Sequence, residues 1–142
     1  MINMSDITRA VEEMLREHTA DYTIERNGAR NDDPNVAALG NGWIGIRKGK
    51  KDYEAYSTGP AKYLCDLEVI VEVQYARFDD AAEAEDHIEE AVEEILGILN
   101  NHQDLDGKVS HLTGFNVTYD VNTDVDAYHY AAVITVRAQA RG

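Results

Sequence analysis

The residues that could carry out chemistry begin with GIRKGKK at positions 45–51, where lysines stand beside glycines as they do in a phosphate-binding loop. That loop requires a glycine five residues before its Gly-Lys pair and a Ser or Thr directly after the pair. Here the pair is Gly49-Lys50, the earlier position is Ile44, and Lys51 follows. No helix start follows either. We therefore expect no nucleotide site at this position.

A second candidate is the segment 120–126, which places oxygen-bearing side chains at the first, third, fifth and seventh positions of a calcium-binding loop. In such a loop the sixth residue is Gly and the twelfth is a bidentate Glu. This sequence has Val125 and Ala131 at those positions, and no helical pattern flanks the segment. We expect a hydrated turn there, and weak binding of a cation stays open. The side chains concerned are Asp120, Asn122, Asp124 and Asp126.

The other potential nucleophiles and metal ligands are scattered. The histidines lack the paired spacing of a zinc site, and no serine lies in a G-x-S-x-G context. Glu68 and Glu72 share one face of an expected strand, but simple alternation produces that spacing. We therefore predict no catalytic residue, no cofactor site, no metal site and no enzymatic activity. The histidines are at positions 18, 87, 102, 111 and 129.

Composition limits the class of protein. The 142 residues include 27 Asp and Glu against 13 Lys and Arg, which gives a formal net charge of −14. The length predicts one domain spanning residues 1–142, and the charge repels nucleic acids and anionic membranes. Three explanations remain: a surface adapted to high salt, a surface past which DNA slides, or a DNA mimic. Low Lys and high Asp favour a halophilic origin.

Targeting and redox signals are few. No apolar run approaches the roughly 18 residues that a membrane helix needs, and MINMSDITRA is not a signal peptide. Cys65 is the single cysteine and cannot form an internal disulfide, which fits a reducing compartment. Because it lies in an alternating apolar run, we expect it in the core rather than as a reactive thiol.

Periodicity predicts the elements that surround these residues. Residues 5–20 form an amphipathic helix capped by Ser5 or Asp6, residues 21–28 a strand, and residues 29–42 a polar loop. Residues 65–77 are the clearest strand, since apolar side chains alternate with polar ones. A helix follows from Asp79 to Asn101, with apolar residues at spacings of three and four. Residues 115–121 and 128–136 form two closing strands.

The segment 43–56 is predicted to be a hairpin. Trp43, Ile44 and Ile46 form its first strand, Lys48-Gly49-Lys50 its turn, and Tyr53 begins the return strand. The predicted order is therefore α-β-β-β-β-α-β-β. The fold class is α+β, with two helices packed on one face of a largely antiparallel or mixed sheet.

Two charged surfaces are not part of any catalytic or metal-binding motif. Four basic residues lie around the predicted hairpin turn, while the helix 79–101 carries many acids and no basic residue occurs between Arg77 and Lys108. Between identical copies, such surfaces would form a head-to-tail contact that repeats until a ring closes. A solvated edge turn is the simpler alternative. The residues predicted to lie at a subunit or partner interface are Trp43, Arg47, Lys48, Lys50, Lys51, Tyr53, Glu83, Asp86, Glu90, Glu93 and Glu94.

The chain resembles the tail-terminator (tail-completion) proteins of long-tailed phages, the minor tail protein U group and related tail-to-head joining proteins. Two fragments carry the resemblance: CDLEVIVEVQYARFDD running directly into AEAEDHIEEAVEEILGIL, and the closing strand AYHYAAVITVRAQA. It extends over nearly the whole chain by element order. No individual residue can be carried over from the family.

The resemblance implies a ring, usually of six copies, seated on the last ring of tail-tube protein in the virion. Such a ring ends tube polymerisation and docks to the head connector or head-completion protein, and genome DNA passes through its lumen. It would assemble in the host cytoplasm and needs no cofactor and no membrane. The acidity suggests a virus of a halophilic host. Two other functions stay open: an acidic DNA mimic and a small ferredoxin-like binding protein or enzyme.

Overall fold

A computed structural model of the chain describes residues 2–26, 29–55, 63–122 and 127–141. They form a mixed five-stranded sheet with two longer helices, which confirms the predicted α+β class. The elements along the chain are α1 (Met4–His18), β1 (Tyr22–Arg26), α2 (Pro34–Ala37), β2 (Gly42–Ala55), β3 (Tyr63–Arg77), α3 (Ala81–Asn100), β4 (His111–Asn122) and β5 (Tyr128–Arg141).

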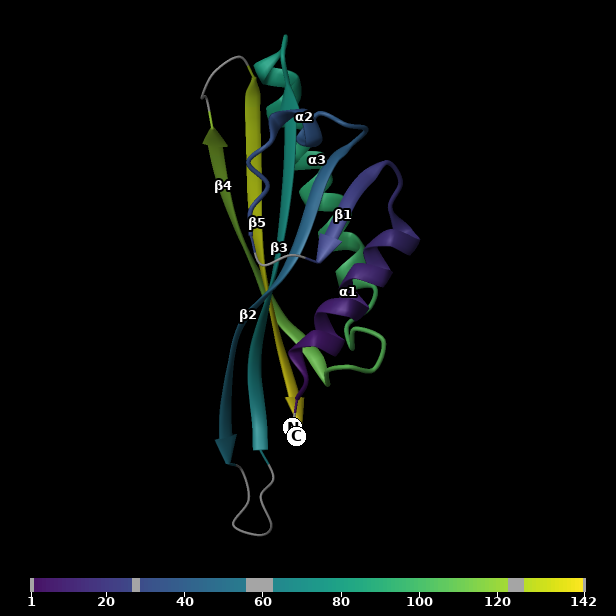
Figure 1. Cartoon of the computed structure of the whole chain (residues 1–142). Coiled ribbons are helices and arrows are strands. Elements are labelled where there is room, and N and C mark those ends of the chain that lie inside the picture. Colours follow the sequence, from purple (N-terminus) through teal and green to yellow (C-terminus); the bar gives the residue numbers. More distant parts are fainter. Residues whose placement is uncertain (1, 27–28, 56–62, 123–126, 142) are drawn as a thin grey trace.

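The strands lie in the order β1-β2-β3-β5-β4. β1 pairs with β2 in parallel, whereas the β2–β3, β3–β5 and β4–β5 pairs are antiparallel. Among the described residues, the short parallel pairing runs as far as Arg26 opposite Ile46. Beyond that point no described strand pairs with this side of β2, which there forms one edge of the sheet, and β4 forms the opposite edge (Figure 1).

The core lies between one face of the sheet and the two longer helices, α1 and α3, which pack side by side on that face (Figure 1). The predicted apolar stripe of the second long helix is confirmed, because every residue expected in it is buried. The inward-facing residues of β3, including Cys65, Val69 and Val73, are buried as their alternation predicts. The stripe of α3 consists of Ala84, Ile88, Ala91, Val92, Ile95 and Leu99.

Both long helices begin at side-chain caps. Asp80 accepts a hydrogen bond from the backbone N–H of Glu83 at 3.1 Å, which satisfies one of the free donors of the first turn of α3. At α1 the cap is Asn3, whose side chain accepts from the N–H groups of Ser5 and Asp6. The prediction that Ser5 or Asp6 caps this helix is therefore wrong, because the helix begins earlier, at Met4.

The predicted hairpin within residues 43–56 is also wrong. β2 runs without a turn from Gly42 to Ala55, and its partner along this length is β3. A β-bulge stands where the turn was expected: Lys48 pairs with Val69 and Lys51 with Leu67, so β2 holds one extra residue. The sheet therefore has one strand fewer than predicted.

Gly49 meets a steric requirement of this bulge rather than the positive φ of a turn. A Cβ atom at this position would lie 2.6 Å from the carbonyl oxygen of Glu68 on the neighbouring strand. Glycine is the residue that permits such a close approach between two backbones.

The segment predicted as a polar loop, residues 29–42, contains the short helix α2, which lies against β2 and β3. Within the described ranges, no helix is long and apolar enough to cross a membrane.

Candidate functional site

Lys48, Lys50 and Lys51 lie on β2 where that strand has become the edge of the sheet; we call these three residues the basic edge. All three are exposed. The Nζ of Lys51 donates to the carbonyl oxygen of Ile2 at 3.1 Å, and that of Lys50 lies 3.8 Å from Asp52. Lys48 makes no hydrogen bond or ion pair with another residue that the structure describes. The basic edge is therefore an exposed, positively charged part of the surface.

Two residues predicted for the same interface lie elsewhere. Trp43 is 1% exposed, and its ring packs over Gly45, where a Cβ atom would stand 2.1 Å from the indole. Its Nε1 donates to Glu25 at 3.2 Å. Arg47 points to the face opposite the core, and its Nη1 donates to Glu72 at 2.9 Å. Trp43 is thus not a surface residue, and Arg47 has an internal partner.

Tyr53 is half-buried rather than displayed to a partner. Its hydroxyl accepts a hydrogen bond from the backbone N–H of Ile2 at 3.1 Å, and its ring meets that of Tyr63 edge to face at 6.0 Å. The Nζ of Lys51 lies 5.5 Å from the centre of the Tyr53 ring. Tyr53 therefore anchors the start of the chain to the sheet beside the basic edge.

The predicted acids of α3 are all exposed, and among the described residues no basic side chain of α3 itself is present to pair with them. Two of them have partners from other elements: Glu83 accepts from Arg77 at 3.0 Å, and Glu94 accepts from the Tyr22 hydroxyl at 3.3 Å. Burial, helped by the negative charge of Glu94, raises the pKa of Tyr22. The exposed acids named from the sequence are Glu83, Asp86, Glu90, Glu93 and Glu94.

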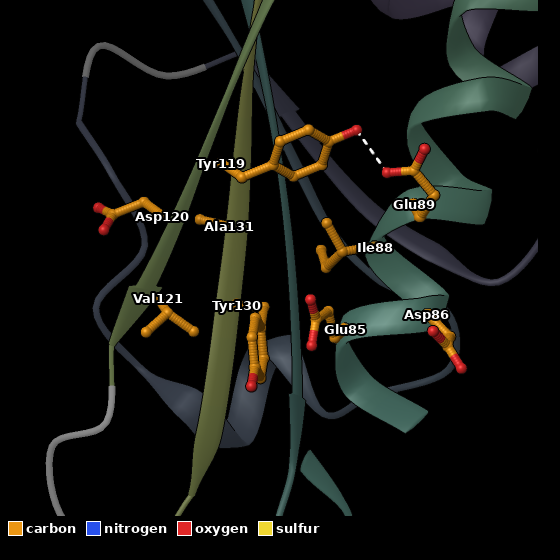
Figure 2. A pocket seen from close by; sticks show the side chains of 9 residues that line it. All are labelled: Glu85, Asp86, Ile88, Glu89, Tyr119, Asp120, Val121, Tyr130 and Ala131. Atoms are coloured by element: carbon orange, nitrogen blue, oxygen red, sulfur yellow. Dashed lines mark hydrogen bonds between the residues drawn. The ribbon is translucent and has the colours of Figure 1, made fainter. Parts of the chain in front are cut away.

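A groove of about 630 Å³ lies between α3 and the β4 edge of the sheet (Figure 2). Glu85, Asp86 and Glu89 form its helix wall, and we call it the acidic groove. Tyr119 and Val121 of β4 form the opposite wall, and none of the described residues that line the groove is Lys or Arg. The side chain of Asp120 points to the other side of β4, where it meets Arg30 at 3.3 Å. The remaining lining residues are Ile88, Tyr130 and Ala131.

The two walls of the groove are joined by one hydrogen bond. The Tyr119 hydroxyl donates to Glu89 at 2.6 Å, although the Tyr119 side chain is 51% exposed (Figure 2). The bond to this carboxylate, together with partial burial, raises the pKa of Tyr119 to about 12. The sequence predicted a strand at residues 115–121, which include Tyr119, but not the groove. The groove depends on where β4 lies relative to α3, and this arrangement is set by tertiary packing.

A buried ionic cluster lies on the sheet face opposite the core, and the sequence did not reveal it. Glu72 of β3 is fully buried and accepts hydrogen bonds from Arg30 at 2.7 Å and Arg47 at 2.9 Å. The amide of Gln74 donates to the same carboxylate at 2.5 Å. Burial opposes the charge of Glu72, but these three donors together outweigh it and lower the pKa of the carboxyl group.

The cluster continues to His129 of β5. Its Nε2 lies 2.8 Å from the side-chain oxygen of Gln74, so the neutral ring donates to this amide. Burial lowers the pKa of His129, which favours that neutral form. His129 is not a surface residue, because its side chain is only 7% exposed. Each member of the cluster has a partner within the chain, so the cluster links the segment before α2 to β2, β3 and β5.

Sites for metal chemistry were not predicted, and among the described residues no group of three or more His, Cys, Asp and Glu is placed to hold a metal ion. The candidate cation segment 120–126 lies partly outside the described residues, which include it only as far as Asn122. Cys65 is buried, as predicted, and its burial raises the pKa of the thiol.

No family model and no curated protein matches the chain. Among solved structures, the chain is similar to a chain of the virion of a native gene transfer agent (GTA) particle. The two are 14% identical, the similarity covers 94% of each chain, and the TM-score is 0.38. We draw no function from a similarity of this size.

Proposed function

We propose that this protein is a virion structural protein of the head–tail junction. In this proposal it forms a ring that caps the tail tube, ends tube polymerisation and docks to the head connector. The observation that carries the proposal is the placement of the basic edge and the acidic groove at opposite edges of one sheet. One copy can therefore contact two neighbours at the same time, one through each edge.

Opposite edges make the contact heterologous, since the surface given by one copy differs from the surface that receives it. A heterologous contact repeats from copy to copy until the rotation closes a ring. The proposed ring has six copies, as the resemblance to tail-terminator proteins implies. Its partners are the tail-tube protein on one side and a head-completion or connector protein on the other.

The charge of the chain supports a role beside DNA that requires no binding to DNA. A formal net charge of −14 repels a polyanion, so genome DNA can pass through the lumen of the proposed ring without adhering to it. The same charge opposes contact between copies at low ionic strength. We therefore propose that the virus infects a halophilic host, where concentrated salt screens the repulsion within about 3 Å.

The proposed role is assembly rather than catalysis. The strongest polar cluster is centred on Glu72, whose carboxylate is fully buried and bound by Arg30 and Arg47, so this carboxylate is engaged within the chain. In this proposal the protein needs no cofactor, and its location is the virion.

Sedimentation velocity tests the proposal. The purified chain is measured at about 0.1, 0.5 and 2 M salt, alone and with the tail-tube protein encoded beside it in the same genome. We expect a closed oligomer of one defined size, either alone or after addition of tail-tube protein. Negative-stain images of the same samples should show rings. A chain that remains monomeric under all these conditions would contradict the proposal.

A further inference from the structure

We propose that the acidic groove between α3 and β4 is the receiving site for the basic edge of a second copy of this chain. This inference rests on the proposed ring and specifies its contact. Lys50 of one copy would enter the groove beside Glu85, while Lys48 would lie along β4. The four elements concerned are β2 of the first copy and α3, β4 and β5 of the second.

The groove has the two chemical features that a lysine side chain requires. Its helix wall carries Glu85, Asp86 and Glu89, which are exposed and can accept hydrogen bonds from an ammonium group. Its other side presents the tyrosine rings of residues 119 and 130, along which the aliphatic stem of lysine can pack. An ammonium group near such a ring also gains a cation–π interaction.

Two other acids, Glu72 and Glu83, are less suited to receive this contact. Glu72 is buried and already bound by two arginines, so no external lysine can reach it. On α3, Glu83 is paired with Arg77. By contrast, no Lys or Arg of the described residues lines the acidic groove. The groove therefore combines exposed carboxylates with a concave surface, which the exposed acids elsewhere on α3 lack.

Apolar side chains are exposed at the β4 edge of the sheet, and a partner seated there would cover them. Tyr119 and Val121 are 51% and 45% exposed, and Tyr128 on the neighbouring strand is 43% exposed. Soluble proteins protect long edge strands with Lys, Pro or bulges. β4 has twelve residues, no Lys and no Pro, although a bulge interrupts its pairing between Leu112 and Gly114, far from Tyr119. A second copy seated here would cover the exposed apolar side chains.

The geometry also indicates that the lysines entering the groove come from a second copy and not from the chain that forms the groove. The basic edge and β4 are separated by β3 and β5 in the sheet, so the lysines of one chain cannot fold back into its own groove. The charges are complementary, and the two surfaces do not overlap. Together these features fit a head-to-tail contact between identical chains.

A charge-swap cycle tests this contact by sedimentation velocity and light scattering. The variants are Lys50→Glu, Glu85→Lys and the double variant with both changes. Each single variant places like charges together and should raise the concentration needed for half-assembly by about tenfold or more. The double variant restores an opposite pair at every contact and should recover most of that loss. Glu13→Lys, an exposed change of the same charge on α1, is the matched control and should assemble like the wild type.

The outcomes separate this inference from the proposed function. If the wild type assembles and both single variants assemble equally well, the groove contact is wrong while the ring proposal stands. Loss of assembly in the double variant equal to the sum of the single losses would also overturn the contact. If the wild type never assembles, both proposals fail. Circular dichroism of each variant shows whether the monomer remains folded.

Cysteine cross-linking gives a second measurement. A Lys50→Cys and Glu85→Cys double variant should form disulfide-linked ladders under mild oxidation, since each copy joins two neighbours. Each single cysteine variant should give no ladder, because Cys65 is buried. A double variant that assembles without forming a ladder would place the lysines elsewhere.

Discussion

Glu72 and Glu93 are the same residue type in one acidic chain, yet their surroundings are opposite. Glu72 lies on β3 with no exposed surface and receives hydrogen bonds from Arg30, Arg47 and Gln74. Glu93 lies on the exposed face of α3, a helix that contains no Lys or Arg. The protein therefore places two of its few cations on Glu72, at the sheet face opposite the core, and leaves most of the helix acids without such a partner.

This difference separates the two roles that charge has in the molecule. Around Glu72, charge joins segments distant in sequence, because Arg30 belongs to the loop before α2 and also contacts Asp120 of β4. On α3, charge contributes little to the fold and remains available to solvent, salt or a partner. The first arrangement stabilises one chain, whereas the second favours contact between chains.

The largest expected effect comes from making the same substitution at both positions. Glu72→Gln removes the charge that compensates two arginines and should lower the free energy of unfolding by about 2–3 kcal/mol, less than for a fully enclosed pair because Arg30 is partly exposed. Glu93→Gln should be neutral or slightly stabilising, since it reduces repulsion on α3. Urea unfolding followed by circular dichroism measures both. Equal effects would remove the distinction between the two regions.

At low pH, the contribution of the Glu72 carboxylate to the free energy of unfolding should be lost. Its pKa is lowered in the folded protein, so its stabilising effect is fully present above the ordinary carboxyl pKa of about 4.3 and is lost as pH falls through the lower folded value. The difference in unfolding free energy between wild type and Glu72→Gln should therefore shrink as the pH is lowered from 6 towards the acid limit of folding. A difference that stays constant with pH would mean that the carboxylate charge is not responsible.

Salt should act on the helix acids rather than on the buried cluster. Raising salt from about 0.1 M to 2 M screens repulsion among exposed acids, and we expect the melting temperature to rise by about 5 °C. A variant with Glu90→Gln and Glu93→Gln should show a smaller rise, whereas Glu72→Gln should keep the wild-type dependence. Differential scanning calorimetry measures all three. A melting temperature independent of salt would argue against a halophilic origin.

The smallest expected effect concerns the bond across the acidic groove. Tyr119→Phe removes a hydrogen bond to Glu89 at an exposed site, so stability should fall by about 0.5 kcal/mol or less. The clearer signal is spectroscopic. Because the pKa of Tyr119 is raised to about 12, absorbance titration should lose one late-ionising phenol in the variant. Loss of a phenol that ionises near pH 10 would show that the bond is absent in solution.

The amphipathic elements could be predicted from the sequence because each has one buried face. The apolar positions of α1, α3 and β3 recur at the periods of a helix and a strand, and the apolar stripe of each of the two helices is buried. The same rule was less informative for β4. Tyr119 and Val121 fit an alternating strand, but they are exposed because β4 lies at the edge of the sheet. Local periodicity does not determine the order of strands in a sheet.

The hairpin at 43–56 was predicted wrongly for a reason that the bulge explains. Ile46 and Tyr53 both face the core side although seven positions separate them, because the bulge adds one residue between Lys48 and Lys51. In the sequence, the alternation of apolar and polar residues is interrupted beside a glycine and three lysines, which is also the pattern of a turn. Pairing with a long β3 decides between a turn and a bulge, and that pairing is non-local.

The cluster at Glu72 could not be predicted because its partners are distant in sequence. Arg30 and Arg47 stand 42 and 25 residues before it along the chain. The only local signal was that Glu72 and Gln74 flank Val73 in the most apolar strand, and solvent exposure explains that pattern equally well. Only the covering of this sheet face by the loop before α2 makes these polar residues internal.

The burial of Trp43 has a practical consequence for studies of this molecule. It is the single tryptophan of the chain, 1% exposed and bonded through its indole nitrogen to Glu25. Its fluorescence emission should therefore lie at short wavelength in the folded state and shift to the red when the first two strands separate. The native sequence thus carries its own optical reporter, which is buried on β2 and is not itself part of the surfaces where neighbouring copies are proposed to meet.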